Sequence, residues 1–206
     1  MIAANQRQIL LSGLFLGLFA VVGTTLVALT EYSTTEAIAD NERAVLLRNL
    51  HALLPPDRLD NDIVTDTLML EASALLGTDT ESLVYRARAG GEPVAAIFNS
   101  IAPNGYSGRI HLLVGIYVNG EIAGVRVGKH AETPGLGDAI EIRKSAWITG
   151  FDGRSLDNPG PQGWAVRRDG GEFDQFTGAT ITPRAVVEAV RNTLLYYQAN
   201  ADMIFQ

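Results

Sequence analysis

The chain has no cysteine among its 206 residues. This absence excludes, within the chain itself, cysteine-ligated iron–sulfur clusters, cysteine zinc sites, disulfides and thiol catalysis. Histidine is also scarce, and His51, His111 and His130 do not show the spacing of a metal site. No catalytic triad or dinucleotide-binding fingerprint is present either. We therefore predict no metal site and no catalytic residue in this chain.

Positive charge is in deficit as well. The chain has 16 Lys and Arg residues against 23 Asp and Glu residues, which gives a formal net charge of −7 at pH 7. A nucleic-acid-binding surface needs the opposite sign of charge. No nucleic-acid partner is therefore expected.

Charge is absent altogether from Ile9 to Leu29. As a helix, this stretch is long enough to cross about 30 Å of hydrocarbon. A cleavable signal peptide is the alternative, but its apolar region is typically only about 7–15 residues long, and the A-x-A pattern Ala37–Ala39 lies well beyond the span. We predict an uncleaved anchor in residues 1–30, with the span at about 9–29 and in contact with membrane lipid.

The charges that flank this span predict its orientation. Arg7 precedes it, whereas Glu31 and Glu36 follow it. The positive-inside rule then places the N-terminus in the cytoplasm. We expect a single-pass protein of the inner (cytoplasmic) membrane, with its remaining domain on the periplasmic or extracytoplasmic side.

Residues 31–84 are predicted to form a helical connecting region. An amphipathic pattern runs from Glu36 to Leu54 and stops at Pro55-Pro56. A second helix is predicted from Ile63 to Leu76, ended by Gly77.

From Val94 the pattern becomes typical of strands. Ile110–Val118 and Glu121–Val127 flank Asn119-Gly120, which favours a two-residue type I′ hairpin. That turn predicts the cross-strand pairs Ile116–Ala123, Val114–Val125, Leu112–Val127 and Gly115–Gly124. The glycine pair would leave a bare patch, which either admits a backbone, helix or planar ligand or marks a twist or bulge.

The segment Asp174–Thr180 indicates an anion-binding site at the start of a helix. The helical pattern extends from Ala185 to Tyr197, with Thr182 as the expected N-cap and Pro183 as the first helical residue. A phosphate near Thr180 would meet free backbone N–H groups and the positive end of the helix dipole.

A second signature, His130–Asp138, continues through Arg143–Trp147. It is rich in Gly and Pro and is expected to be an ordered loop at the end of a strand. Gly105–Gly108 forms a further turn ahead of the hairpin. Gly153–Gly171 is expected to be a long surface loop anchored by Trp164.

Together, these two signatures resemble the FMN-binding domain shared by RnfG and NqrC, subunits of membrane respiratory complexes. The resemblance covers roughly residues 85–197, and the anchor and chain length are more similar to RnfG than to the longer NqrC. It implies an α+β fold: a transmembrane helix followed, in residues 85–206, by a domain whose antiparallel sheet is packed by helices.

In the family, the last threonine of the motif carries FMN through a phosphoester bond made by a flavin transferase. By position, the resemblance implies one covalent FMN per chain on Thr180. The residues implied in transferase recognition are Asp174, Thr177, Gly178, Ala179 and Thr180. The residues implied near the cofactor are Thr177, Gly178, Ala179, Glu132, Thr133, Leu136, Gly137, Tyr106 and Lys144.

Several of these residues have a structural alternative. Glu132 could accept hydrogen bonds from loop N–H groups, and Tyr106 could be a half-buried turn residue instead of a stacking partner. Lys144 could favour anionic reduced flavin or be a solvated surface residue. Asp174 could form a turn, and His130 is expected to be a hydrogen-bonding residue of its loop.

The resemblance implies an electron-transfer subunit of an Rnf-type complex, which couples electron flow between ferredoxin and NAD to ion translocation. A single span cannot translocate ions, so other subunits are required as partners. Two alternatives remain open: an NqrC-like subunit of a sodium-pumping quinone reductase, or an anchored binding module without a redox role.

Overall fold

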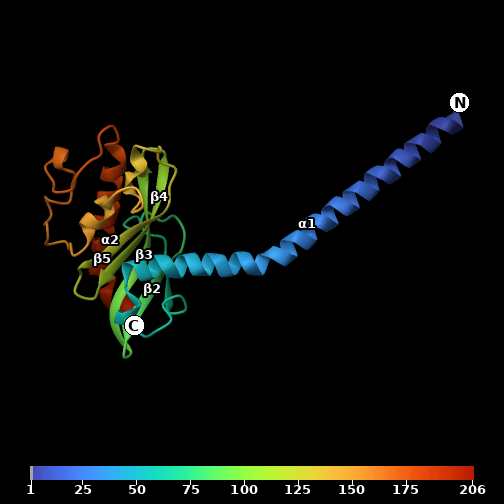
Figure 1. The fold of residues 1–206 in the computed structure, drawn as a ribbon. Helices are drawn as coiled ribbons and strands as arrows, with labels where there is room; N and C mark the ends of the chain where they lie inside the picture. Colours follow the sequence, from blue (N-terminus) through green and yellow to red (C-terminus); the bar gives the residue numbers. More distant parts are fainter. Residues whose placement is uncertain (1) are drawn as a thin grey trace. The chain divides into compact units, whose positions relative to one another are not determined.

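The computed structural model describes the backbone of residues 2–206 and the side chains of residues 11–206 other than Glu36 and Glu42. The chain divides into two compact units, one ending at Leu46 and the other spanning Leu47–Gln206. The first unit is helical, and the second contains the sheet (Figure 1). The Arg7 side chain, on which the predicted orientation depends, lies outside the described residues.

Helix α1 runs without interruption over Ile2–Leu53. Its large apolar side chains from Leu11 to Leu29 are exposed, and by length and composition it is the one described helix that could cross a membrane. The polar stretch that follows contains no Gly or Pro to break the helix. There the Thr34 and Thr35 hydroxyls donate to carbonyls four residues earlier. The predicted amphipathic helix is therefore the end of α1, not a separate element.

The second unit is built on a five-stranded antiparallel sheet with strand order β1-β2-β3-β4-β5. The strands are β1 (Thr67–Leu70), β2 (Ser82–Ala89), β3 (Glu92–Gly105), β4 (Gly108–Tyr117) and β5 (Ile122–Lys129). Four short 3₁₀ helices cover Pro56–Arg58, Gly137–Ile140, Ala146–Phe151 and Arg167–Asp169. The C-terminal helix α2 spans Ile181–Phe205. The predicted α+β fold, with an antiparallel sheet packed by helices, is confirmed.

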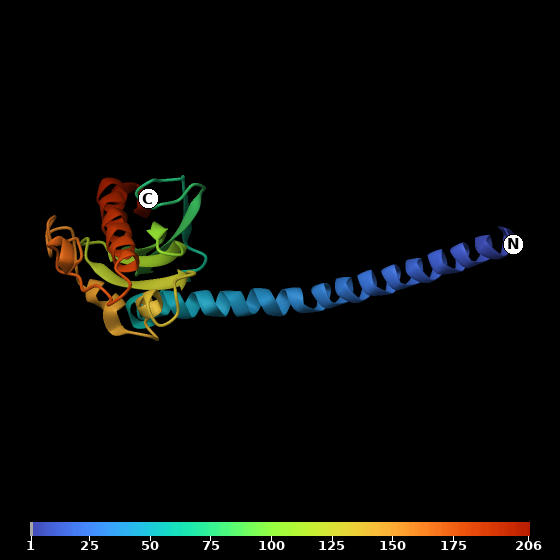
Figure 2. The same cartoon turned by 90° about the horizontal axis from the view of Figure 1, so that it is seen from above.

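Different helices cover the two faces of this sheet (Figure 2). Val114 contributes to the core beneath α2, so its neighbour Gly115 faces the opposite side. The last turn of α1 lies there, because a Cβ added to Gly124 would be 3.0 Å from Leu53 Cδ2 and one added to Gly115 would be 3.6 Å from Leu53 Cβ. The bare patch at Gly115 and Gly124 therefore lies against the end of helix α1, which is the first of the two predicted uses. The strand register also shifts between Gly115 and Ile116, so the second use, a bulge, is present as well.

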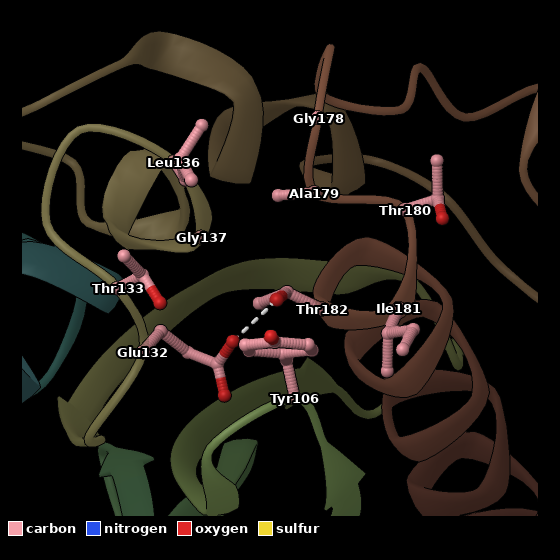
Figure 3. A pocket seen from close by; sticks show the side chains of 10 residues that line it. All are labelled: Tyr106, Glu132, Thr133, Leu136, Gly137, Gly178, Ala179, Thr180, Ile181 and Thr182. Atoms are coloured by element: carbon pink, nitrogen blue, oxygen red, sulfur yellow. Dashed lines mark hydrogen bonds between the residues drawn. The ribbon is translucent and has the colours of Figure 1, made fainter.

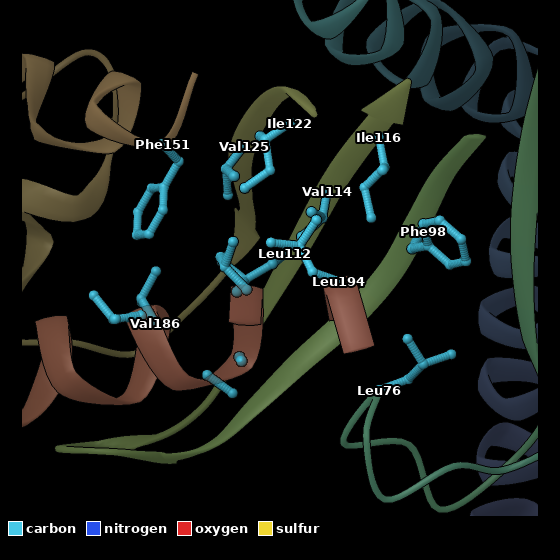
Figure 4. Packing of buried hydrophobic residues seen from close by; sticks show 14 of the residues in the cluster. Leu76, Phe98, Leu112, Val114, Ile116, Ile122, Val125, Phe151, Val186 and Leu194 are labelled. Carbon is cyan, nitrogen blue, oxygen red and sulfur yellow. The ribbon is translucent and has the colours of Figure 1, made fainter. Parts of the chain in front are cut away.

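The main core lies between the sheet and α2 (Figure 4). It combines strand residues such as Phe98 and Leu112 with Val186 and Leu194 of α2, and Phe151 closes one end. A buried Leu truncated to Ala typically costs about 2–5 kcal/mol, so this packing holds α2 firmly in place. The N-terminal end of α2 is thereby fixed relative to the loops at the end of the sheet.

The helix predicted for Ile63–Leu76 is wrong. Asp62 accepts the Val64 N–H with its side chain and the Thr65 N–H with its carbonyl, which forms a turn in place of a helix start. The following residues form β1, which pairs with β2.

The β4–β5 hairpin confirms the predicted pairs Val114–Val125, Leu112–Val127 and Gly115–Gly124. The predicted Ile116–Ala123 pair is wrong, because the register shift brings Ile116 opposite Ile122. The turn is not type I′ either. Gly120 has a φ of 86°, but positive φ among the described residues is confined to glycine, so Asn119 lacks the second positive φ that type I′ requires.

Candidate functional site

The two sequence signatures meet at one pocket of about 260 Å³ (Figure 3). Three segments form it: the turn between β3 and β4, the loop after β5, and the segment that leads into α2. The residues that line it are Tyr106, Glu132, Thr133, Leu136, Gly137, Gly178, Ala179, Thr180, Ile181 and Thr182.

Glu132 holds the three segments together. Its side chain is buried, with only 4% of the residue exposed. Oε1 accepts the backbone N–H of Ser107 at 2.9 Å, and Oε2 accepts the hydroxyl of Thr182. Glu132 is therefore a structural hydrogen-bond acceptor, which is one of the two roles that the sequence analysis considered for it.

The loop after β5 has its own hydrogen-bond network. His130 Nδ1 accepts the Glu132 N–H at 3.0 Å, so the proton lies on Nε2, which is 3.0 Å from Glu141 Oε1. The Arg143 guanidinium and then the His130 ring hold the pKa of Glu141 below its usual value. His130 is thus a loop hydrogen-bonding residue, as predicted.

Asp138 shapes the next part of the loop. Its buried carboxylate accepts the Gly135 N–H at 2.8 Å. Lys144 Nζ lies 3.5 Å from the same carboxylate and is more than half exposed. Gly137 is required by close packing, because a Cβ there would be 2.8 Å from Glu132 Oε2 and 2.9 Å from Thr182 Oγ1.

The segment before α2 contains a tight turn. The Ala179 N–H donates to the Phe176 carbonyl at 3.2 Å, and Gly178 has a φ of 81°. A positive φ at the third residue is typical of a type II turn, where glycine is favoured. A Cβ on Gly178 would be 3.3 Å from Leu136 Cδ2, so the two signatures are in contact here.

Helix α2 begins earlier than the sequence predicted. Its first residue is Ile181 and its N-cap is Thr180. The prediction of Thr182 as N-cap and Pro183 as first helical residue is therefore wrong. Thr182 is fully buried, and its hydroxyl binds Glu132 instead. The Thr180 hydroxyl caps no backbone N–H of the described helix and is free for other chemistry.

The pocket suits a flavin mononucleotide. Large apolar side chains remain exposed around it: Tyr106 is 66% exposed, Leu136 43% and Ile181 45%. In the view of Figure 3, Tyr106 and Leu136 lie on opposite sides of the pocket, where they could cover a planar ring. The Thr180 hydroxyl and the first N–H groups of α2 offer positions for a phosphate.

Comparison with known proteins agrees with this geometry. Residues 105–195 match the FMN-binding domain family, and residues 1–53 match the RnfG N-terminal region. The chain is 50% identical over 194 residues to the G subunit of the ion-translocating oxidoreductase complex of Pseudoalteromonas atlantica, which covers 94% of this chain and 90% of that protein. It belongs to the RnfG family.

The chain is similarly close to the G subunits of this complex from two other bacteria. The protein of the same name from Pseudomonas aeruginosa is 50% identical over 202 residues, covering 98% of this chain and 94% of that protein. The one from Shewanella loihica is 47% identical over 199 residues, covering 97% and 94%. All ten pocket residues lie inside the matched FMN-binding domain.

Most site residues that the family resemblance implied line the pocket, but three of them do not. Thr177, Lys144 and Asp174 lie outside the lining. Two lining residues were missed as site residues: Ile181, whose one sequence signal was its position directly after the motif, and Thr182, which was interpreted only as a cap.

Proposed function

We propose that this RnfG-family chain is an electron-transfer subunit that carries one FMN, linked to Thr180 by a phosphoester bond. The observation that carries the proposal is the position of Thr180 as the N-cap of α2 beside the pocket. The family match to an FMN-binding domain supports the cofactor itself. A separate flavin transferase would make the bond, with Asp174 and Thr177–Thr180 as its recognition segment.

The chemistry of electron transfer belongs to the flavin, and the chain supplies attachment and environment. The Thr180 oxygen would carry the phosphate next to the positive end of the α2 dipole. Leu136 and Tyr106 would cover the ring faces and exclude water. Glu132 positions the loop and contributes no reacting group. No catalytic site of the chain's own is part of the proposal.

The partners follow from the same comparisons. Relatives named as the G subunit of an ion-translocating oxidoreductase complex support assembly with the other subunits of an Rnf-type complex. Within it, the flavin would relay electrons between ferredoxin and NAD while other subunits move the ion. The similarity over nearly the whole chain favours this assignment over an NqrC-like subunit.

We also propose that α1 anchors the chain in the inner membrane, with the N-terminus cytoplasmic and the FMN domain periplasmic. The exposed apolar stretch from Leu11 to Leu29 supports the anchor, and the flanking charges support the orientation. Protease added to intact spheroplasts should digest the domain. Digestion only after lysis would contradict this orientation.

Absorption spectroscopy tests the flavin assignment against an anchored module without a redox role. The chain, co-expressed with a flavin transferase, should keep a flavin spectrum after denaturation and removal of small molecules. A colourless denatured chain would contradict covalent attachment, and a colourless native chain would also contradict flavin binding.

A further inference from the structure

Trp147 contacts the segment that carries Thr180. Its indole Nε1 donates to the Asp174 carbonyl at 2.7 Å. Its ring packs edge-on against Phe176, with ring centroids 5.1 Å apart, and against Phe151 at 5.4 Å. The Ser145 hydroxyl accepts the Trp147 N–H at 3.1 Å and fixes the start of the short helix that contains it. Trp147 therefore holds two residues of the segment, one through its backbone and one through its ring.

These contacts determine where Thr180 lies. Phe176 begins the turn that the Ala179 N–H closes, and Thr180 follows this turn directly. On the far side, the hydrogen bond from Thr182 to Glu132 fixes the first turn of α2. The residues on both sides of Thr180 are therefore held in place. Trp147 binds the segment before it, and Glu132 binds Thr182 after it.

The contacts with Trp147 leave other side chains of the segment exposed to solvent. The Asp174 carbonyl points to Trp147, but its side chain is 64% exposed and forms an ion pair with Arg167 at 3.1 Å. Thr177 and Gly178 are also exposed. Trp147 therefore holds the backbone of the segment while the side chains inferred to be recognised remain exposed.

We propose that Trp147 is a positioning residue for flavin transfer to Thr180, because it holds the acceptor segment in the conformation that the transferase binds. This inference rests on the proposed covalent attachment. An acceptor segment that is already ordered loses less conformational entropy when it binds, so pre-organisation should improve binding more than the chemical step.

The flavin donor in this transfer is a flavin dinucleotide. Its phosphoanhydride provides a leaving group, whereas the phosphate monoester of FMN does not. The Thr180 oxygen forms a bond to the phosphorus of the flavin phosphate, and the P–O bond of the anhydride breaks. The nucleoside monophosphate leaves with the electron pair, and the hydroxyl proton passes to a base of the transferase. No group is oxidised or reduced.

The chain contains a matched control for this role. Trp164 also donates its indole Nε1 to a backbone carbonyl, that of Ser155 at 3.0 Å. It belongs to the same aromatic cluster, with its ring 5.2 Å from Phe173, and it is buried. Trp147→Phe and Trp164→Phe therefore remove the same donor from the same kind of acceptor, but only the first acceptor lies in the attachment segment.

The experiment measures flavin transfer to the full-length chain in detergent by a purified flavin transferase with flavin adenine dinucleotide. Trp147→Phe should raise the KM for the chain roughly three- to tenfold, the effect of one lost hydrogen bond, with little change in kcat. Trp164→Phe should match the wild type, whatever its effect on the unfolding temperature. Phe176→Leu, which keeps Trp147 but removes the ring that Trp147 contacts in the attachment segment, should also raise KM. This variant serves if Trp147→Phe does not fold.

An unchanged KM for both folded variants of the Trp147–Phe176 pair, or an equal rise for Trp164→Phe, would overturn the role of Trp147. The proposed function fails in a different way. If the wild-type chain itself accepts no flavin on Thr180, covalent attachment is wrong. If the wild type is modified there and the folded Trp147→Phe and Phe176→Leu variants keep the wild-type KM, only the positioning role is wrong.

Discussion

The Thr182 hydroxyl donates a hydrogen bond to the Glu132 carboxylate, 50 residues earlier in the chain. Both groups are buried, and Glu132 also accepts the Ser107 N–H. This single contact joins the start of α2 to the loop after β5. Both residues line the pocket that we assign to the flavin.

Thr182→Val should separate this role from ordinary stability. The change keeps the side-chain shape but leaves Glu132 Oε2 without its donor, so we expect a loss of about 1–3 kcal/mol and weaker retention of flavin. Thr193→Val is the control, because the buried Thr193 hydroxyl lies on the same helix and donates to Ser100 at 2.8 Å. Urea unfolding in detergent and flavin content measure the two effects. Equal flavin content in the two variants would argue against a pocket-specific role for Thr182.

Gly178→Ala should impair the site more than the fold. A non-glycine residue at a φ of 81° costs about 1–2 kcal/mol, and the new Cβ would also press on Leu136. Gly170→Ala is matched, because Gly170 has a φ of 88° but open space around its added Cβ. Both variants should lose similar stability, whereas only Gly178→Ala should lose flavin incorporation. Comparable incorporation would show that contact with Leu136 is unimportant.

Asp66 should contribute stability that depends on pH. Burial alone would raise the pKa of Asp66, but hydrogen bonds and charge from Arg86 at 2.6 Å and Arg88 at 3.0 Å outweigh burial and lower the pKa. A carboxyl with a lowered pKa stabilises the fold above its unfolded pKa, about 3.9. This contribution is lost as the pH falls through the folded-state pKa.

Asp66→Asn should therefore lower the free energy of unfolding at pH 7 by about 1–3 kcal/mol. The free energy of unfolding of the variant should also fall less steeply than that of the wild type as the pH is lowered. Asp79→Asn is the control, because Asp79 is 71% exposed in its ion pair with Arg109. Its effect should stay within about 1 kcal/mol. Chemical unfolding measured between pH 3 and pH 7 gives the free energy of unfolding of each variant. Parallel pH profiles for wild type and Asp66→Asn would contradict the assignment.

Local patterns predicted part of the sheet that carries the site. The strand alternation that places Val114 opposite Val125 was readable, as was the glycine patch at Gly115 and Gly124. The family resemblance, and no local rule, pointed to Leu136 and Gly178, and both residues line the pocket. For the strand pairs, the decisive information lay within a few residues of the Asn119-Gly120 turn.

Predictions failed where distant contacts decide. Pro183 fits a first helical position, so Thr182 looked like the N-cap, but burial against Glu132 recruits its hydroxyl instead. Ile63–Leu76 has helical spacing, yet pairing with β2 makes part of it an edge strand. The anchoring of the attachment segment by Trp147 depends on a contact 27 residues away, which no local rule contains.

Peptide mapping of the purified, co-expressed chain tests the central claim most directly. Cleavage after Arg168 and Arg184 releases a peptide that contains Thr177, Thr180 and Thr182. Fragmentation should place the mass of one FMN less one water on Thr180, Thr180→Ala should carry no covalent flavin, and Thr180→Ser should retain the acceptor hydroxyl. An adduct on Thr177 or Thr182, or covalent flavin retained by Thr180→Ala, would contradict the account.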